Sequence, residues 1–320
     1  MRTFFKYQAT VVLSALSLFM PFLPAKALVV QPAIQDVQVD PGKGETKFIR
    51  ATNDDITTQT YFVTIQKFVP KGDSGQQDFL PASDTTGLPE WTYVDQPEIT
   101  LKPGESANLQ VSFRVPPSAP PGGYYEALFL SKRQTATEPL AMLPRLGVLF
   151  FVRVNGQAEE RLAVTQFSVD ANSYWSLPVG FRTTVANEGM IHEQPEGMVT
   201  VRNFFGATVA KFPANPDGNR ILPQSSHILL SAWSKGAVFP VTGYWSGLKQ
   251  ELNNFAIGPY VAFVTFNGPG FSGDVVKEVR FAVWPWRTMT AVGVLIIALV
   301  VLFFLLKKLI IKRATASPKT

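Results

Sequence analysis

Few residues in this sequence have the type and spacing that catalytic chemistry requires. The chain of 320 residues contains no Cys and two His, His192 and His227. Neither His has a second His or a carboxylate at metal-ligand spacing, and the adjacent pair His192-Glu193 is more typical of a solvated loop. The absence of Cys excludes disulfides, zinc fingers and cysteine nucleophiles. We therefore predict no metal site and no cofactor.

Motifs for nucleophilic or acid–base catalysis are also missing. Ser246 and Ser272 lie near glycines, but not at the G-x-S-x-G spacing of a nucleophile elbow. The carboxylate pairs at 54–55 and 159–160 are adjacent in sequence, so on an extended chain their side chains point to opposite faces. The sequence offers no catalytic residue, and we expect that the chain is not an enzyme.

The elements that must position any site are strands. Apolar residues alternate with polar ones along 109–115 and 175–185, and the run 147–154 is apolar enough for a central strand. Clusters of Pro, Gly and Asn, such as 102–105, separate these runs and are typical of tight turns. The pattern predicts an all-β chain with two tandem antiparallel β-sandwiches of the immunoglobulin type.

The composition divides the chain into five segments. A polar run after Asn155-Gly156 separates the two predicted sandwiches. The segments are a signal peptide at 1–27, the sandwiches at 28–156 and 157–284, a transmembrane helix with its tryptophan flank at 285–306, and a basic tail at 307–320. Within the sandwiches, the polar stretch 71–89 and the stretch 234–254 are predicted as loops.

The N-terminal segment has the three parts of a secretory signal. Arg2 and Lys6 precede an apolar stretch at 7–23, and the small residues Ala25 and Ala27 form an A-x-A cleavage site. We expect cleavage after Ala27, which exports the rest of the chain.

The C-terminal segment has the length and flanks of a transmembrane helix. Residues 288–306 carry no charge, and at about 1.5 Å per residue they span about 28 Å, close to the thickness of a bilayer core. Trp284 and Trp286 precede the stretch, and Lys307 and Lys308 follow it, as at the two membrane interfaces. Because basic residues stay on the cytoplasmic side, we predict a single-pass protein of the cell membrane whose sandwiches lie outside the cytoplasm.

The basic excess of the chain belongs to these two ends. The formal net charge is +5, but all 24 acidic residues and only 20 of the 29 basic residues lie between Leu28 and Val283. The predicted sandwiches are therefore net negative, which argues against nucleic acid as a partner.

Four aromatic residues are candidates for contact with a partner. Phe204 and Phe205 fall at the tip of a hairpin predicted between 198–203 and 208–212, and Trp245 and Phe271 lie in Gly-rich loops. The alternative for the Phe pair is that one ring folds back into the core, and Phe271 has a second alternative at the membrane interface. Binding by strand addition is also open, because residues 29–39 could form an exposed edge strand or could themselves supply the added strand.

The order of turns and strands resembles a known family. Its motifs are Ala-Thr-Asn-Asp at 51–54, a Lys-Pro-Gly-Glu turn at 102–105, Pro-Pro-Gly-Gly at 120–123, Asn-Glu-Gly at 187–189 and Gly-Pro-Tyr at 258–260. The arrangement resembles bacterial surface proteins of the WxL-interacting type, which have a signal peptide, two immunoglobulin-like domains, one transmembrane helix and a short basic tail. It is also similar, more loosely, to the N-terminal domain of pilus chaperones, without clear equivalents of their basic anchoring pair.

Two functional hypotheses follow. The resemblance implies a non-enzymatic binding or scaffold protein that presents its two sandwiches to a cell-wall polymer or to an envelope protein. The alternative is a chaperone-like assembly factor of a membrane or surface complex, whose helix and juxtamembrane tryptophans make the main contacts. A helix that only anchors should tolerate replacement by an unrelated apolar helix, whereas an assembling helix should not.

Overall fold

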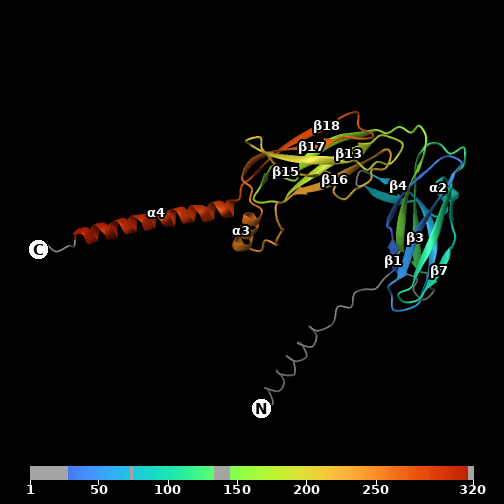
Figure 1. Ribbon diagram of the computed structural model, residues 1–320, viewed down its shortest axis with the longest axis horizontal. Coiled ribbons are helices and arrows are strands. Elements are labelled where there is room, and N and C mark those ends of the chain that lie inside the picture. The colour runs from blue at the N-terminus through green and yellow to red at the C-terminus, as the bar shows by residue number, and fades with distance from the viewer. Residues whose placement is uncertain (1–27, 73–74, 133–144, 316–320) are drawn as a thin grey trace, which may run out of the picture.

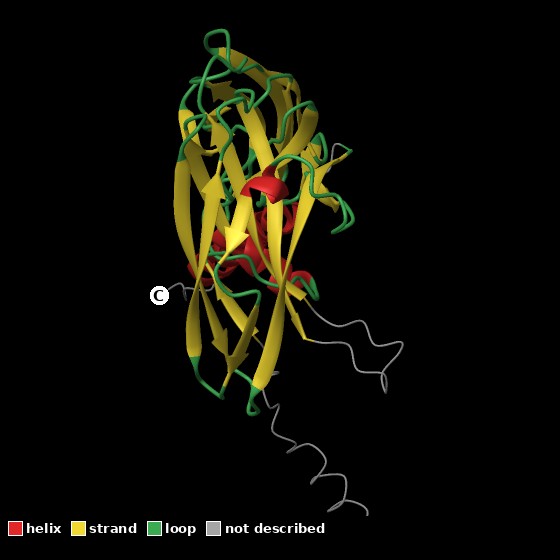
Figure 2. Ribbon diagram, turned by 90° about the vertical axis from the view of Figure 1, so that its right-hand side faces the viewer, coloured by secondary structure: helices red, strands yellow, loops and turns green. Residues whose placement is uncertain are grey.

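The protein consists of two β-sandwiches followed by a long helix. The computed structural model describes residues 28–72, 75–132 and 145–315. Strands make up nearly all of both sandwiches, and helices are few (Figure 2). The prediction of an all-β chain with tandem immunoglobulin-like sandwiches and one C-terminal apolar helix is confirmed. The predicted signal peptide lies outside the described residues.

The first sandwich packs a sheet of order β1-β3-β8-β6 against a sheet of order β2-β10-β9-β4. β7 pairs with the first residues of β4, and β5 pairs with its last residues. The elements are β1 (Leu28–Gln31), β2 (Ile34–Val39), β3 (Gly44–Asn53), β4 (Gln59–Lys71), β5 (Gln76–Phe79), α2 (Leu88–Trp91), β6 (Thr92–Val94), β7 (Glu98–Leu101), β8 (Ser106–Arg114), β9 (Gly122–Lys132) and β10 (Arg145–Val154).

The N-terminal residues contribute an edge strand to each sheet of this sandwich. β1 pairs antiparallel with β3, and β2 pairs parallel with β10. The two strands are separated by Pro32, which has no N–H to donate to a ladder, and Ala33. Both strands end the order of their sheets, so of the two possibilities that the sequence leaves open for residues 29–39, the structure shows the edge.

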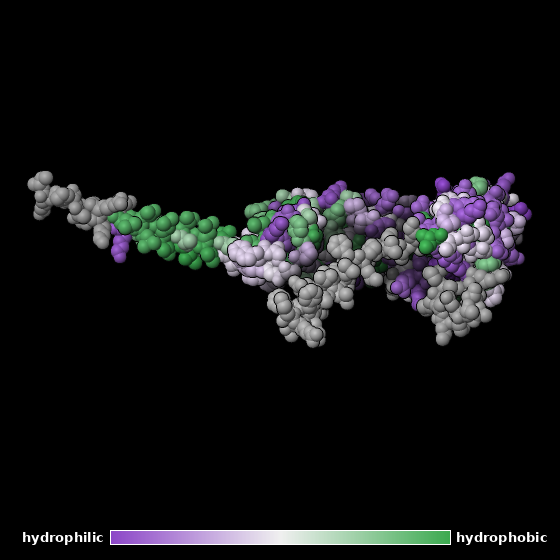
Figure 3. Space-filling model, turned by 90° about the horizontal axis from the view of Figure 1, so that it is seen from below, coloured by the Kyte–Doolittle hydropathy of each residue, from purple (hydrophilic) through white to green (hydrophobic). Residues whose placement is uncertain are grey.

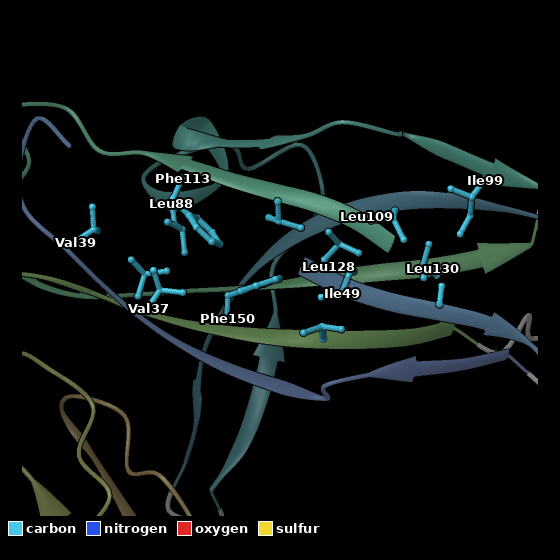
Figure 4. Close-up of a cluster of buried hydrophobic side chains, with 14 of the residues drawn as sticks. Val37, Val39, Ile49, Leu88, Ile99, Leu109, Phe113, Leu128, Leu130 and Phe150 are labelled. Carbon is cyan, nitrogen blue, oxygen red and sulfur yellow. The ribbon is translucent and has the colours of Figure 1, made fainter. Parts of the chain in front are cut away.

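Alternating apolar residues of the two sheets fill the first core. The inward side chains are large and almost fully buried, and they interdigitate between the sheets (Figure 4). They include Val37, Ile49, Leu109, Phe113, Leu128 and Phe150, of which the rings of Phe113 and Phe150 meet edge to face at 5.2 Å. The period-two pattern of the sequence therefore marks the faces of the strands that are buried.

The second sandwich packs a sheet of order β11-β13-β16 against a sheet of order β12-β18-β17-β14-β15. Its core contains the fully buried Trp233, Phe181 and Phe266. The elements are β11 (Leu162–Val169), β12 (Ser173–Tyr174), β13 (Val179–Asn187), β14 (Gly197–Asn203), β15 (Thr208–Pro213), β16 (Ser225–Trp233), α3 (Tyr244–Asn253), β17 (Gly258–Phe266) and β18 (Val275–Val283), followed by α4 (Trp286–Thr315).

α4 projects from the far end of the second sandwich, and α3 lies beside its beginning (Figure 1). Residues Trp286–Leu309 of α4 make a 24-residue stretch that is long and apolar enough to cross a membrane, and the large apolar side chains of this stretch are exposed. The two sandwiches lie across one another, so that the molecule is bent between them (Figure 1).

Two predicted loops are wrong in part. The stretch 71–89 contains β5, which forms a hairpin with the end of β4, and it ends in Leu88, the first residue of α2 and almost fully buried. Phe79 of β5 packs edge to face on Phe129 at 5.1 Å. The stretch 234–254 contains α3. Both stretches are mostly polar, so the pattern predicts a loop. Their few apolar residues pack against residues that are distant in sequence.

A buried carboxylate in the first core gives the fold a pH dependence. Glu126 on β9 is fully buried, and neither carboxylate oxygen has a hydrogen-bond partner among the described residues. Burial disfavours the charged form and raises the pKa of Glu126 from 4.5 to about 8. The folded protein therefore holds a proton that the unfolded chain releases above its own pKa, so stability falls as the pH rises from 4.5 to 8.

We expect Glu126→Gln to reduce the loss of folding stability at higher pH, because the amide stays neutral at every pH. Chemical denaturation of the full-length protein in detergent at pH 5, 6.5 and 8 measures the free energy of unfolding. Its fall with pH should be smaller in the variant, by a few kcal/mol at most. Glu45→Gln, at a partly exposed residue that pairs with Lys47, is the control and should keep the fall of the unmodified protein. An unchanged fall in Glu126→Gln would show that Glu126 is ionised in the fold.

Candidate functional site

The predicted hairpin tip exposes two aromatic rings. β14 and β15 form the hairpin, and Asn203 Oδ1 accepts hydrogen bonds from the backbone N–H of Phe205 (3.1 Å) and Ala207 (3.0 Å). Gly206 has φ 83°, which a side chain would strain. Phe204 and Phe205 are 66% and 81% exposed, and their ring centroids are 3.9 Å apart. The alternative that one ring enters the core is therefore wrong. We call this pair the aromatic tip.

The register of the sheet places the aromatic tip at the end of the domain from which α4 leaves. Asn203, the last residue of β14, lies opposite Tyr260, and Gly258, the first residue of β17, lies opposite Val283. Val283 ends β18, three residues before α4 begins. The aromatic tip therefore faces the same side as the start of the apolar helix.

The other two aromatic candidates differ from each other. Trp245 is 78% exposed on the first turn of α3, at the α4 end of the domain. Phe271 is half-buried and packs on the core ring of Phe266, with centroids 5.5 Å apart. It follows β17, whose last residues lie at the end away from α4, so its alternative placement at the membrane interface is wrong.

The residues expected at the membrane interfaces lie at the two ends of the apolar stretch of α4. Trp284 and Trp286 are partly exposed beside the first turn, and Lys307 and Lys308 are exposed on the helix near its far end. Hydrophobic surface covers α4, and the adjoining end of the second domain carries hydrophobic patches among paler and hydrophilic ones (Figure 3).

A buried carboxylate joins the second domain to α4. Glu251 of α3 is fully buried, and its Oε2 accepts hydrogen bonds from the N–H (2.7 Å) and the hydroxyl (2.9 Å) of Thr288. Its Oε1 lies 3.3 Å from an Arg287 guanidinium nitrogen. A negative charge is favourable at the start of a helix, where N–H groups lack partners within the helix. Gly247 allows the close approach, because a Cβ there would meet the Arg287 side chain at 2.5 Å. We call Glu251, Arg287 and Thr288 the helix clamp.

Buried polar side chains fix α3 and the loop before it to the sandwich. Gln250 donates a hydrogen bond to the Leu177 carbonyl (3.0 Å) and accepts one from the Phe239 N–H (2.9 Å). Asn254 accepts hydrogen bonds from the N–H groups of Lys235 and Gly236. Both side chains are almost fully buried, so α3 is an integral part of the domain.

The bend between the sandwiches is also fixed by specific contacts. Asp36 on β2 binds Arg220 of the second domain through both carboxylate oxygens, and Arg220 lies over the Phe151 ring at 5.3 Å. His192 Nε2 is 3.4 Å from Asp36 Oδ1. Leu222 of the second domain packs into a buried aromatic cluster on the first. We call Asp36, His192, Arg220 and Leu222, with the cluster that they touch, the domain joint.

The sequence context of His192 predicts a solvated loop. This prediction is wrong. Its side chain is nearly buried against the rings of Tyr125 and Phe151. Burial lowers its pKa to about 4, although Asp36 acts in the opposite direction, so the imidazole is neutral near pH 7. Burial and the nearby Glu160 raise the pKa of Glu193 to about 7. The pKa shift of His192 arises from its burial in the domain joint. No group of three or more His, Cys, Asp or Glu able to hold a metal occurs among the described residues.

A polar groove on the outer face of the second domain adjoins the domain joint. Its volume is about 630 Å³. The lining residues include Gln194, Thr200, Lys211, Asn215, Thr265 and Asn267. Amide and hydroxyl side chains of this kind hydrogen-bond sugars as well as peptides. Sequence reasoning missed the groove, because its residues come from three separate segments.

Comparison with known proteins finds solved structures of chaperones at low sequence identity. No family model and no curated sequence matches the chain. The class 5 fimbriae chaperone CfaA is 12% identical with a TM-score of 0.40, and the match covers 78% of this chain and 98% of that one. The Pseudomonas aeruginosa chaperone CupB2 is 12% identical with a TM-score of 0.35, covering 80% and 100%. The E. coli chaperone DraB is 14% identical with a TM-score of 0.32, covering 81% and 97%.

We expect loss of the helix clamp to loosen α3. Glu251→Gln keeps the volume but removes the charge that faces Arg287 and the start of α4, which should cost about 2 kcal/mol. Hydrogen exchange of the full-length protein in detergent should show faster exchange across α3. Glu278→Gln, which removes an exposed carboxylate paired with Arg280, is the control and should leave α3 unchanged. Unchanged exchange in both variants would show that the carboxylate does not hold α3.

We expect the domain joint to depend on Arg220. Arg220→Ala removes both the ion pair with Asp36 and the contact with Phe151. Arg182→Ala is the matched control, because it breaks only an exposed pair with Asp170. Spin labels at Phe48→Cys and Lys277→Cys report the distance between the domains, without native Cys to remove. The distance distribution should broaden in Arg220→Ala alone, and equal distributions would show that Leu222 and the aromatic cluster suffice.

Proposed function

We propose that this chain is a single-pass membrane protein that holds two sandwich domains outside the cytoplasm and binds a cell-wall polymer or an envelope protein without catalysing a reaction. The apolar surface of α4 and the basic residues near its far end support the anchoring. The WxL-interacting type of surface protein remains our hypothesis for the family.

The aromatic tip is the observation that carries the binding role. Two adjacent Phe rings, tilted by 38° to each other, stand in solvent on a hairpin whose turn is fixed by Asn203 and Gly206. Exposed aromatic residues on a rigid support lose little conformational freedom when a partner covers them. A partner that covers the aromatic tip lies close to the membrane, because the tip faces the same side as α4.

The aromatic tip can be tested with the full-length protein in lipid nanodiscs. We expect Phe204→Ser with Phe205→Ser to fold normally, because neither ring is buried, and to lose recovery of the envelope-protein partner several-fold. Phe48→Ser removes another exposed ring, from β3 of the first domain, and should change neither property. Phe271→Ser should destabilise the second domain, because its ring packs on the core. Equal recovery by the tip variant and the Phe48 variant would reject the tip as the binding site.

The polymer is tested in a parallel arm. Co-sedimentation with washed cell-wall polymer is measured for the unmodified protein and for Lys211→Glu, which reverses a charge in the polar groove. Lys277→Glu reverses the charge of an exposed lysine outside the groove and serves as the control. Weaker sedimentation of Lys211→Glu alone would place the polymer in the groove.

A chaperone-like assembly factor is a second candidate, favoured by one observation. β2 pairs with β10 only from Leu149, so Arg145–Val148 of β10 pair with β9 on one side and with no described strand on the other. An open edge of this kind can accept a strand of a partner. Leu146 is the exposed apolar residue of this edge.

Replacement of α4 separates the two candidates. Residues 291–306 are exchanged for an unrelated Leu- and Ala-rich sequence, while Arg287, Thr288 and Thr290 keep their contacts with α3. Binding to the polymer or envelope partner should survive if α4 only anchors. Loss of co-purified membrane partners, together with their loss in Leu146→Asp, would favour the assembly factor.

A further inference from the structure

α3 lies beside the first turn of α4. The Tyr244 hydroxyl donates a hydrogen bond to the Arg287 carbonyl (3.0 Å) and is 2.9 Å from Thr290 Oγ1. Its ring meets Trp286 edge to face at 5.9 Å. Thr290 is four residues into α4, so at about 1.5 Å per residue α3 lies alongside its first 6 Å or so. Any surface that α4 enters is therefore met by α3 as well.

The length of α4 places this turn in the headgroup region. The 19 uncharged residues 288–306 span about 28 Å, close to a hydrocarbon core of about 30 Å, so Trp286 and Arg287 lie outside that core. The first turn of the helix, with α3 beside it, is left in the layer where lipid headgroups and tryptophan rings lie.

The side chains around α3 suit that layer. Exposed apolar residues follow one another through the loop and the helix: Val238, Val241, Trp245 and Leu252. The acidic residue between 234 and 257 is Glu251, which is buried in the helix clamp, whereas Lys235 and Lys249 are exposed. The surface of this segment is therefore apolar and basic, as in helices that lie in the plane of an anionic membrane.

We propose that residues 238–253 form a foot that lies in the lipid headgroup layer, on the side of the membrane that holds the second domain. The proposal rests on the proposed crossing of the membrane by α4 and adds a second contact with the lipid. Trp245 is then a lipid contact and not a contact with a protein partner. Gln250 and Asn254 fix the foot to the sandwich and the helix clamp fixes it to α4, so the foot also sets the tilt of the second domain on the membrane.

Depth-dependent quenching tests the foot. Because the chain has no Cys, single Cys substitutions can be labelled with an environment-sensitive fluorophore in the full-length protein. The protein is reconstituted in vesicles of phosphatidylcholine and phosphatidylglycerol, with and without brominated acyl chains. Trp245→Cys probes the foot, Leu299→Cys probes the middle of α4, and Phe48→Cys is an exposed position on the first domain.

We expect blue-shifted emission and several-fold stronger quenching by brominated lipid at Trp245→Cys and Leu299→Cys than at Phe48→Cys. A label at Trp245→Cys that emits as in water, beside a quenched label at Leu299→Cys, overturns the foot and leaves the anchoring intact. An unquenched label at Leu299→Cys overturns the anchoring and the foot together. Leu252→Cys repeats the test at the other end of α3, so the result does not depend on loss of the Trp245 side chain.

Discussion

The burial of one carboxylate of α3 against the start of α4 fixes the orientation of α4 relative to the second domain. Glu251 is surrounded by protein, and such a charge is stable there only because Thr288 and Arg287 supply donors and a positive charge. Those donors belong to the first residues of α4, so α3, the sandwich and the helix hold one relative orientation. A flexible linker between the second domain and α4 would not fix this orientation.

The domain joint extends the same rigidity to the first sandwich. Asp36, Arg220 and His192 meet across the bend, and the joint also uses Gly75, which touches β16 so closely that a Cβ there would lie 1.6 Å from His227 Nδ1. Gly75 has φ 71°, so both its conformation and its contact require glycine. Forces on the first domain are therefore transmitted to α4 through packed side chains.

Local patterns in the sequence predict much of this structure, because strands, turns and apolar segments are local properties. The alternation of apolar and polar residues, with Gly206 at the turn, predicts the hairpin that carries Phe204 and Phe205. A run of 19 uncharged residues predicts α4. The domain joint does not follow from the sequence, because Asp36 and Arg220 are 184 residues apart. α3 was missed for a related reason: its apolar face is short, and its polar residues Gln250 and Glu251 are buried by contacts with segments that the sequence does not link to it.

The parallel pairing of β2 with β10 determines the order in which the strands of the first sandwich can pair during synthesis. Ile34–Val39 pair with Leu149–Val154, so a strand near the beginning of the first sandwich finds its neighbour only when the last strand of that sandwich has been synthesised. Contacts so distant in sequence form slowly, because a long loop must close first. The first sandwich therefore emerges with an unpaired, partly apolar edge, and it depends on its own C-terminal strand to cover that edge before another chain does.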